Sequence, residues 1–120
     1  MKAVLDTNIL VDYLKGIEAA RKEIAAYSKP AISIISWMEV MVGANADEER
    51  SIRAFLDSFE TININQDIAS LAVKLRKQYR LRLPDAIIWA CARNSNYLLV
   101  TRNSKDFPAS DPSIRVPYAI

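Results

Sequence analysis

Apolar and polar residues along the chain alternate between strand-like and helix-like segments. Continuous or alternating apolar runs predict strands at residues 2–5, 31–35, 59–64, 97–101 and 114–116. Helical spacing of apolar residues predicts helices at residues 9–14, 17–27, 36–44, 47–57, 65–80 and 84–94. Strands separated by helices are typical of an α/β fold with a mostly parallel sheet of roughly four to five strands and helices on both faces.

Three residues mark helix ends in this pattern. Gly16 is suited to a left-handed stop after the first helix, and Asn65 is suited to cap the long helix that follows it. Pro84 fits the first turn of the next helix, where its missing N–H is not needed. These signals support the predicted element boundaries.

The chain of 120 residues has the size of one domain, and with 51% hydrophobic residues and a mean hydropathy of +0.00 it can bury a core. No apolar run approaches the roughly 18 residues that span a bilayer, and the first residues do not resemble a secretory leader. We therefore expect a cytoplasmic protein with no membrane partner. The single cysteine, Cys91, lies between alanines in a helical pattern and is expected to be a small buried hydrophobe.

The sequence contains no histidine, which removes the commonest general base and every Ser-His or Cys-His arrangement. Hydrolytic chemistry in this chain must therefore use carboxylates and other oxygen ligands, which suit Mg²⁺ or Mn²⁺ better than zinc. The net charge of +2 and the pI near 8.8 permit a nucleic-acid partner without requiring one.

Acidic or amide residues follow three of the predicted strands or open the following helix. Asp6 ends the first strand, Glu39 follows the strand at 31–35, and Asp85 opens the helix at Pro84. Asn103 and Asp106 follow the strand at 97–101. Because the carboxyl ends of parallel strands share one edge, we expect these side chains to meet there within a few ångströms. Such a group repels itself unless a divalent cation joins it, and that cation can activate water for phosphodiester hydrolysis.

Each acid also has a purely structural interpretation. Any of residues 6–8 could simply cap the following helix. Ser36 and Glu39 fit a capping box, and Asp85 could be a favourable charge in a first helical turn. For Glu39 and Asp85 taken singly, the structural interpretation is the more common one; together with Asp6, the acids favour a shared cation site.

Four segments, LDTNILVDYL, ISIISWMEVMVGA, LRLPDAIIWACA and LLVTRNSKDF, resemble the PIN-domain endoribonucleases, and most closely the toxins of VapBC-type toxin–antitoxin pairs. The resemblance covers nearly the whole chain. It implies a single PIN domain over residues 1–120, an acidic pocket that binds Mg²⁺ or Mn²⁺, and cleavage of RNA. It also implies a homodimer and inhibition by a cognate antitoxin protein.

By position, Asp6, Glu39 and Asp85 match the family's three core acids, which the resemblance implies are catalytic and metal-binding. The fourth family position is often an aspartate, and Asn103 stands there; Asn103 and Asp106 are the candidates that complete the site. The resemblance further places Thr7, Asn8 and Thr101 beside the pocket, where they would orient the ligands. The alternative is a catalytically weak or inactive PIN-like module that binds RNA or protein, because an amide at position 103 adds no charge.

Basic residues gather at the end of the predicted long helix, immediately before the turn that carries Asp85. They are Lys74, Arg76, Lys77, Arg80 and Arg82. This cluster is either a solvated helix face or a phosphate-contacting surface, with Arg102 and Lys105 as further candidates for RNA binding. Trp37 and Trp89 lie on apolar helix faces and are expected in the core or in a dimer interface.

Overall fold

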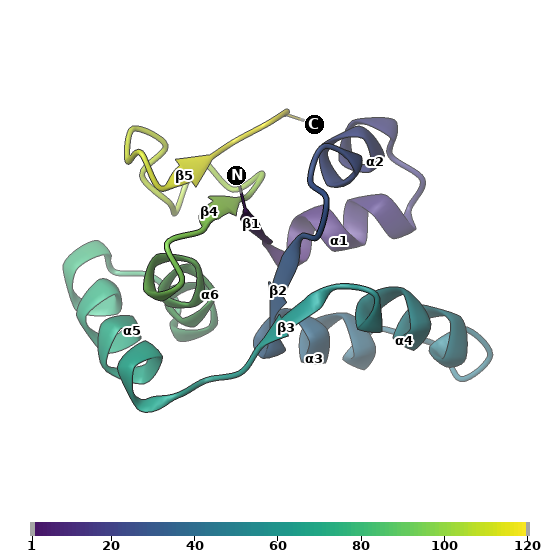
Figure 1. Ribbon diagram of the computed structural model, residues 1–120, viewed down its shortest axis with the longest axis horizontal. Helices are drawn as coiled ribbons and strands as arrows, with labels where there is room; N and C mark the ends of the chain where they lie inside the picture. Colours follow the sequence, from purple (N-terminus) through teal and green to yellow (C-terminus); the bar gives the residue numbers. More distant parts are fainter. Residues whose placement is uncertain (1, 120) are drawn as a thin grey trace.

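The computed structural model describes residues 2–119, and this part of the chain forms a single parallel sheet in the strand order β3-β2-β1-β4-β5 (Figure 1). The strands are β1 (Ala3–Leu5), β2 (Ala31–Ser33), β3 (Glu60–Ile62), β4 (Leu98–Val100) and β5 (Ile114–Arg115). Every strand pair is parallel. The predicted α/β class is therefore confirmed. Over residues 2–119 the sheet has five strands, the larger of the two numbers expected.

Helices connect most of the strands at the predicted places, although several are shorter or shifted. They are α1 (Thr7–Leu14), α2 (Glu18–Ala25), α3 (Ile34–Val42), α4 (Glu49–Asp57), α5 (Gln66–Tyr79) and α6 (Leu83–Asn94). Two of these differences affect the site. Helices α1 and α3 each begin two residues earlier than the apolar spacing predicts. Polar residues at these starts, Thr7 and Ser36, therefore lie inside helices.

The sheet separates two apolar cores, as the alternation of side chains along a strand requires. Val4 and Leu99 pack with α5 and α6 on one face, whereas Leu5 and Val100 pack with α1, α3 and α4 on the other. Figure 1 shows α5 and α6 together on one side of the sheet and α1 and α2 on the other. Both faces of β1 and β4 are thus buried, which fixes the carboxyl ends of these central strands.

The remaining predictions about the core and the helix ends are confirmed. Trp89 and Cys91 are fully buried, whereas Trp37 is partly buried against the second core. Gly16 has a φ of 82°, the left-handed conformation that glycine adopts without strain. Over residues 2–119, no helix is long and apolar enough to cross a membrane.

The Asn65 cap allows a simple test of the fold. Its Oδ1 accepts a hydrogen bond from the Ile68 N–H at 2.8 Å, and Asn65→Ala removes that acceptor. We expect the free energy of unfolding to fall by about 1 kcal/mol in chemical denaturation. Asn65→Asp keeps the acceptor and should unfold like the wild type; equal losses in both variants would contradict the capping role.

Candidate active site

A cavity of about 290 Å³ opens at the carboxyl end of the sheet, and the three predicted core acids all line it. The lining residues are Asp6, Thr7, Asn8, Val11, Glu39, Arg82, Asp85, Arg102 and Asn103. They come from the end of β1, from α1, α3 and the start of α6, and from the segment after β4. Residues up to 97 positions apart in the sequence therefore share one pocket, hereafter the acidic pocket.

Asp6 caps α1 and also lines the acidic pocket, so the structural and the functional interpretation of this residue are both correct in geometry. Its backbone N–H donates to the Val100 carbonyl across the sheet at 2.9 Å, which anchors it between β1 and β4. Its carboxylate accepts from the Thr7 N–H at 2.7 Å, the Thr101 hydroxyl at 2.8 Å and the Asn8 amide at 3.2 Å. Thr7, Asn8 and Thr101 thus lie beside the pocket as the resemblance implies.

Burial raises the pKa of Asp6 from 3.8 to about 6, because a carboxylate loses water when it is only 4% exposed. The hydrogen bonds from Thr101 and Thr7 oppose this shift, and the negative charges of Asp85 and Glu39 add to it. The anion is therefore unfavourable where it stands. A cation beside it would relieve both the burial and the repulsion.

Glu39 is held by a different contact from the one that the sequence suggests. Ser33, whose hydroxyl accepts from the Ile35 N–H at 3.1 Å, caps α3, and Ser36 lies inside the helix. The structural alternative of a Ser36–Glu39 capping box is therefore wrong. The exposed Glu39 carboxylate instead accepts a hydrogen bond from the Thr7 hydroxyl at 2.7 Å, which ties it to the residue next to Asp6.

Asp85 lies in the first turn of α6, and its side chain is only 9% exposed. It pairs with Arg82, whose Nε lies 3.2 Å from Asp85 Oδ2 and whose side chain is 75% exposed. The interpretation of Asp85 as an ordinary first-turn charge does not explain its burial in a pocket with two other acids. Arg82 partly neutralises it.

Asn103 and Asp106 are linked to each other, but only Asn103 lines the pocket. The Asn103 amide donates to Asp106 Oδ2 at 3.0 Å, and the Asp106 N–H donates to Asn103 Oδ1 at 3.1 Å. The Asn103 N–H also donates to the Thr101 hydroxyl at 3.0 Å, which connects this turn to Asp6. Asp106 is exposed, holds Asn103 through these hydrogen bonds, and also acts by its charge on Arg82.

The acids share a pocket without forming a preassembled ligand group. Among the described residues 2–119, no three Asp, Glu, Cys or His side chains are close enough to hold a metal ion together. The sequence-based expectation of contact within a few ångströms is therefore not met. The reason is local pairing: Glu39 is bonded to Thr7 and Asp85 to Arg82, and like charges keep apart.

Sequence reasoning missed the ion pair beside the pocket. Arg102 donates to Asp12 at 2.7 Å and 3.1 Å, and Asp12 is only 1% exposed. One signal was available, because Asp12 lies one helical turn after Asn8 in an otherwise apolar stretch, where a buried acid requires a partner.

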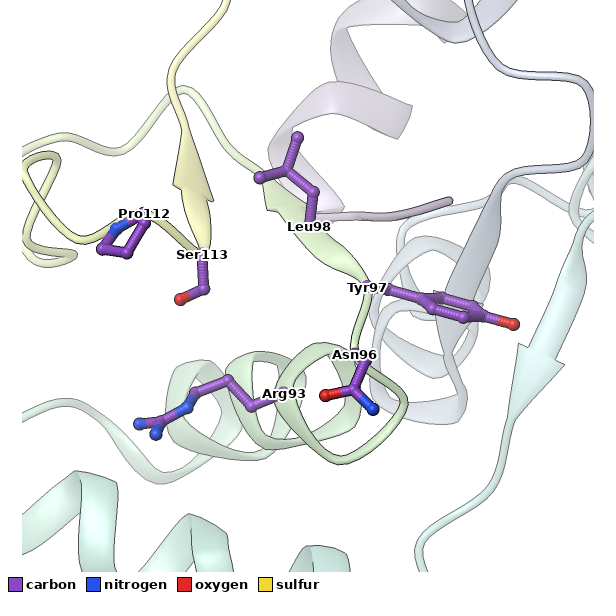
Figure 2. A pocket seen from close by; sticks show the side chains of 6 residues that line it. All are labelled: Arg93, Asn96, Tyr97, Leu98, Pro112 and Ser113. Carbon is purple, nitrogen blue, oxygen red and sulfur yellow. The ribbon is translucent and has the colours of Figure 1, made fainter. Parts of the chain in front are cut away.

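A second cavity, of about 390 Å³, lies at the opposite end of β4 (Figure 2). Its lining residues are Arg93, Asn96, Tyr97, Leu98, Pro112 and Ser113. The Ser113 hydroxyl already accepts from the Trp89 indole N–H at 3.0 Å and donates to Asp111 at 2.7 Å. This cavity has no acidic lining residue, and the larger volume does not make it the better candidate for metal-dependent chemistry.

The parallel sheet with an acidic pocket at its carboxyl edge is matched by a known domain family. The PIN domain family model matches residues 3–110, and the chain therefore belongs to the PIN-domain family. Ribonuclease VapC1 of Methanocaldococcus jannaschii is 31% identical over 112 residues, which cover 88% of this chain and 79% of that protein. Ribonuclease VapC10 of Mycobacterium tuberculosis is 29% identical over 125 residues, covering 98% of this chain and 93% of that protein.

The chain is also similar to a protein of known structure. A toxin–antitoxin complex from Klebsiella pneumoniae contains a chain that is 48% identical and superposes with a TM-score of 0.93. The match covers 98% of this chain and 99% of that one. Nearly all of one chain in that complex therefore has the fold described above.

Proposed function

We propose that this chain is a metal-dependent endoribonuclease and the toxin of a toxin–antitoxin pair, with residues 1–120 forming one PIN domain. The observation that carries the proposal is the acidic pocket, in which Asp6 is buried as an anion beside Glu39 and Asp85. Relatives named VapC ribonucleases and the likeness to a chain of a toxin–antitoxin complex support the same activity. The substrate is RNA in the cytoplasm.

The donor set of the pocket fits Mg²⁺ or Mn²⁺, because it offers carboxylate and amide oxygens and no nitrogen or sulfur ligand. Asp6 and Asp85 would hold the ion, and Glu39 would bind it or the attacking water. When bound, the ion lowers the pKa of water and polarises a phosphoryl oxygen. PIN-domain ribonucleases generally use a divalent metal, which agrees with this assignment.

The chain's own residues supply positioning and proton transfer. Thr101, Asn8 and the Thr7 N–H fix the orientation of the Asp6 carboxylate. Thr7 holds Glu39 through Oε1, which leaves Oε2 to accept a proton from the attacking water. Asn103, held by Asp106, presents an uncharged oxygen at the pocket edge. Water would attack the phosphorus as it gives its proton to Glu39, the bond between phosphorus and the leaving ribose oxygen would break, and that oxygen would take a proton from solvent.

A cleavage assay tests this function and separates it from an inactive scaffold. Purified protein should cut an RNA with unpaired loops when Mg²⁺ or Mn²⁺ is present, and a chelator should abolish the cutting. Asp85→Asn should lose activity while retaining its fold by circular dichroism. Binding of RNA without any cleavage would favour the scaffold, and cleavage that survives chelation would contradict the proposed chemistry.

Cations around the pocket would bind the RNA backbone. Arg82 lines the pocket, Arg80 ends α5, and both side chains reach solvent. Arg80→Ala with Arg82→Ala should weaken RNA binding and reduce the salt slope by roughly 0.7 per lost phosphate contact. Lys22→Ala with Lys29→Ala removes two exposed cations that do not line the pocket and should leave the slope unchanged. Equal slopes in both double variants would show that the arginines are only surface charges.

The proposed partners include a second copy of the chain and an antitoxin protein. Two apolar side chains on α3 are exposed, Met38 at 44% and Val42 at 87%, and a protein interface would remove them from water. Light scattering of the purified toxin should give the mass of a dimer, and Val42→Glu should shift that mass toward the monomer. A wild-type monomer at all concentrations would contradict the homodimer.

A further inference from the structure

The two arginines that line the acidic pocket have different partners. Arg82 pairs with Asp85, which is itself a pocket acid. Arg102 pairs with Asp12, which does not line the pocket. Arg82 therefore neutralises a proposed metal ligand, whereas the charge of Arg102 is balanced from outside.

The pair between Arg102 and Asp12 is rigid. Arg102 Nε lies 2.7 Å from Asp12 Oδ2, and Arg102 Nη2 lies 3.1 Å from Asp12 Oδ1, so the guanidinium plane is fixed by two bonds. Tyr118, near the end of the chain, donates its hydroxyl to Asp12 Oδ2 at 2.9 Å. Burial and the neighbouring Asp12 charge raise the pKa of Tyr118 well above its ordinary value, so this donor keeps its proton.

The geometry leaves part of Arg102 available to a ligand. A guanidinium has five N–H donors, and Asp12 takes two of them, while the side chain is 35% exposed at the pocket. The backbone N–H of Arg102 donates to Asn8 Oδ1 at 3.1 Å, and the Asn8 amide donates to Asp6. The main chain of Arg102 is thus linked to Asp6 through Asn8, and its side chain is held by Asp12.

We propose that Asp12, supported by Tyr118, is a positioning residue that holds the Arg102 guanidinium at the pocket mouth for a phosphate oxygen of the RNA. The inference rests on the proposed function and assigns a role to residues outside the acidic pocket. Asp12 has a second effect, because Arg102 is also attracted by Asp6. Because Arg102 is paired with Asp12, its guanidinium does not form an ion pair with the pocket carboxylates that would bind a divalent cation.

Two binding measurements test this inference without relying on cleavage. One is the affinity for a single-stranded 2′-O-methyl RNA, which resists cleavage, and the other is the affinity for Mn²⁺ without RNA, followed by electron paramagnetic resonance. Asp12→Asn should weaken RNA binding roughly tenfold, because it loses a charged pair of hydrogen bonds that orient Arg102. It should also weaken Mn²⁺ binding, because the released guanidinium turns toward Asp6.

The variant Arg102→Ala separates positioning from a general loss of structure. We expect it to weaken RNA binding as much as Asp12→Asn does, yet to keep the Mn²⁺ affinity of the wild type. The double variant Asp12→Asn with Arg102→Ala should recover that Mn²⁺ affinity, because no guanidinium remains to compete. Non-additive effects of this kind identify residues that act as a unit.

The chain contains a matched control. Glu23 pairs with Arg115 at 2.7 Å and 2.9 Å and accepts from the Tyr27 hydroxyl at 2.7 Å, which repeats the same arrangement away from the pocket. Glu23→Gln should lower stability without changing either affinity. Tyr118→Phe removes the hydroxyl that donates to Asp12 and should weaken RNA binding about threefold. This variant tests the inference if Asp12→Asn does not fold.

The inference is overturned if Asp12→Asn, or Tyr118→Phe where the former is unfolded, binds RNA like the wild type. It is also overturned if Glu23→Gln weakens RNA binding equally, since the effect is then general. Failure of the proposed function looks different, because the wild type would then bind no Mn²⁺ and cleave no RNA.

Discussion

Asp6→Asn should abolish RNA cleavage and at the same time make the cation-free protein more stable at neutral pH. The activity loss should exceed about a hundredfold, because the amide removes the charge of a proposed metal ligand. The gain in stability follows from the raised pKa of Asp6, since burial makes the anion less favourable than the protonated carboxyl. Loss of function with gain of stability is typical of residues that are strained for activity.

The pH dependence of this gain has a definite sign. The pKa of Asp6 is about 6 in the folded protein and near 3.8 when the chain unfolds, so the folded state binds the proton more tightly. The stability that comes from the protonated carboxyl is complete below about pH 4 and is lost as the pH rises through 6. A shift of this size corresponds to roughly 3 kcal/mol at 1.36 kcal/mol per pKa unit.

The difference in unfolding free energy between Asp6→Asn and the wild type should therefore grow between about pH 4 and pH 7. We expect a difference of about 1–2 kcal/mol at neutral pH, because the new amide also disturbs the hydrogen bond from Asn8. Urea denaturation in a chelator measures it. Asp67→Asn changes an exposed first-turn acid on α5 and should leave activity intact. An Asp6→Asn protein less stable than the wild type at every pH would contradict this explanation.

Divalent cations should reverse the instability of the wild type. At about a hundred times its dissociation constant, a cation that binds only the folded state adds roughly 2.7 kcal/mol, or about 10 °C in melting temperature for a domain of this size. Mg²⁺ or Mn²⁺ should raise the melting temperature of the wild type at neutral pH, and much less at pH 4, where Asp6 is protonated. Differential scanning fluorimetry measures both.

Variants inside and outside the acidic pocket are the controls for this prediction. Asp6→Asn and Asp85→Asn should show little or no cation-induced shift, whereas Asp67→Asn should shift like the wild type. An equal rise in all three variants would place the cation elsewhere on the surface.

The fold could be predicted from the sequence because apolar spacing identifies the strands and helices. Their alternation along the chain then indicates a parallel sheet, in which the carboxyl ends of the strands share one edge. The pattern could not locate helix starts, since Thr7 and Ser36 are polar residues that lie inside α1 and α3 rather than before them. For this reason the Ser36–Glu39 capping box was a wrong interpretation. The contact from Thr7 to Glu39 spans 32 positions and has no local signal.

The candidate site was predictable to the level of the pocket and not beyond it. Asp6, Glu39 and Asp85 could be grouped because each follows a strand or opens a helix at one edge. Their contacts could be predicted only in part: Arg82 and Asp85 are three residues apart, a spacing at which side chains meet on a helix, whereas Arg102 and Asp12 lie 90 positions apart and meet only in three dimensions.

The proposed function requires that Asp6 and Asp85 jointly hold a divalent cation at the acidic pocket. Mn²⁺ titration of the wild type, Asp6→Asn and Asp85→Asn, followed by electron paramagnetic resonance at neutral pH, measures this directly. We predict saturable binding by the wild type and at least roughly tenfold weaker binding by each variant. Wild-type Mn²⁺ affinity in either variant would contradict the claim.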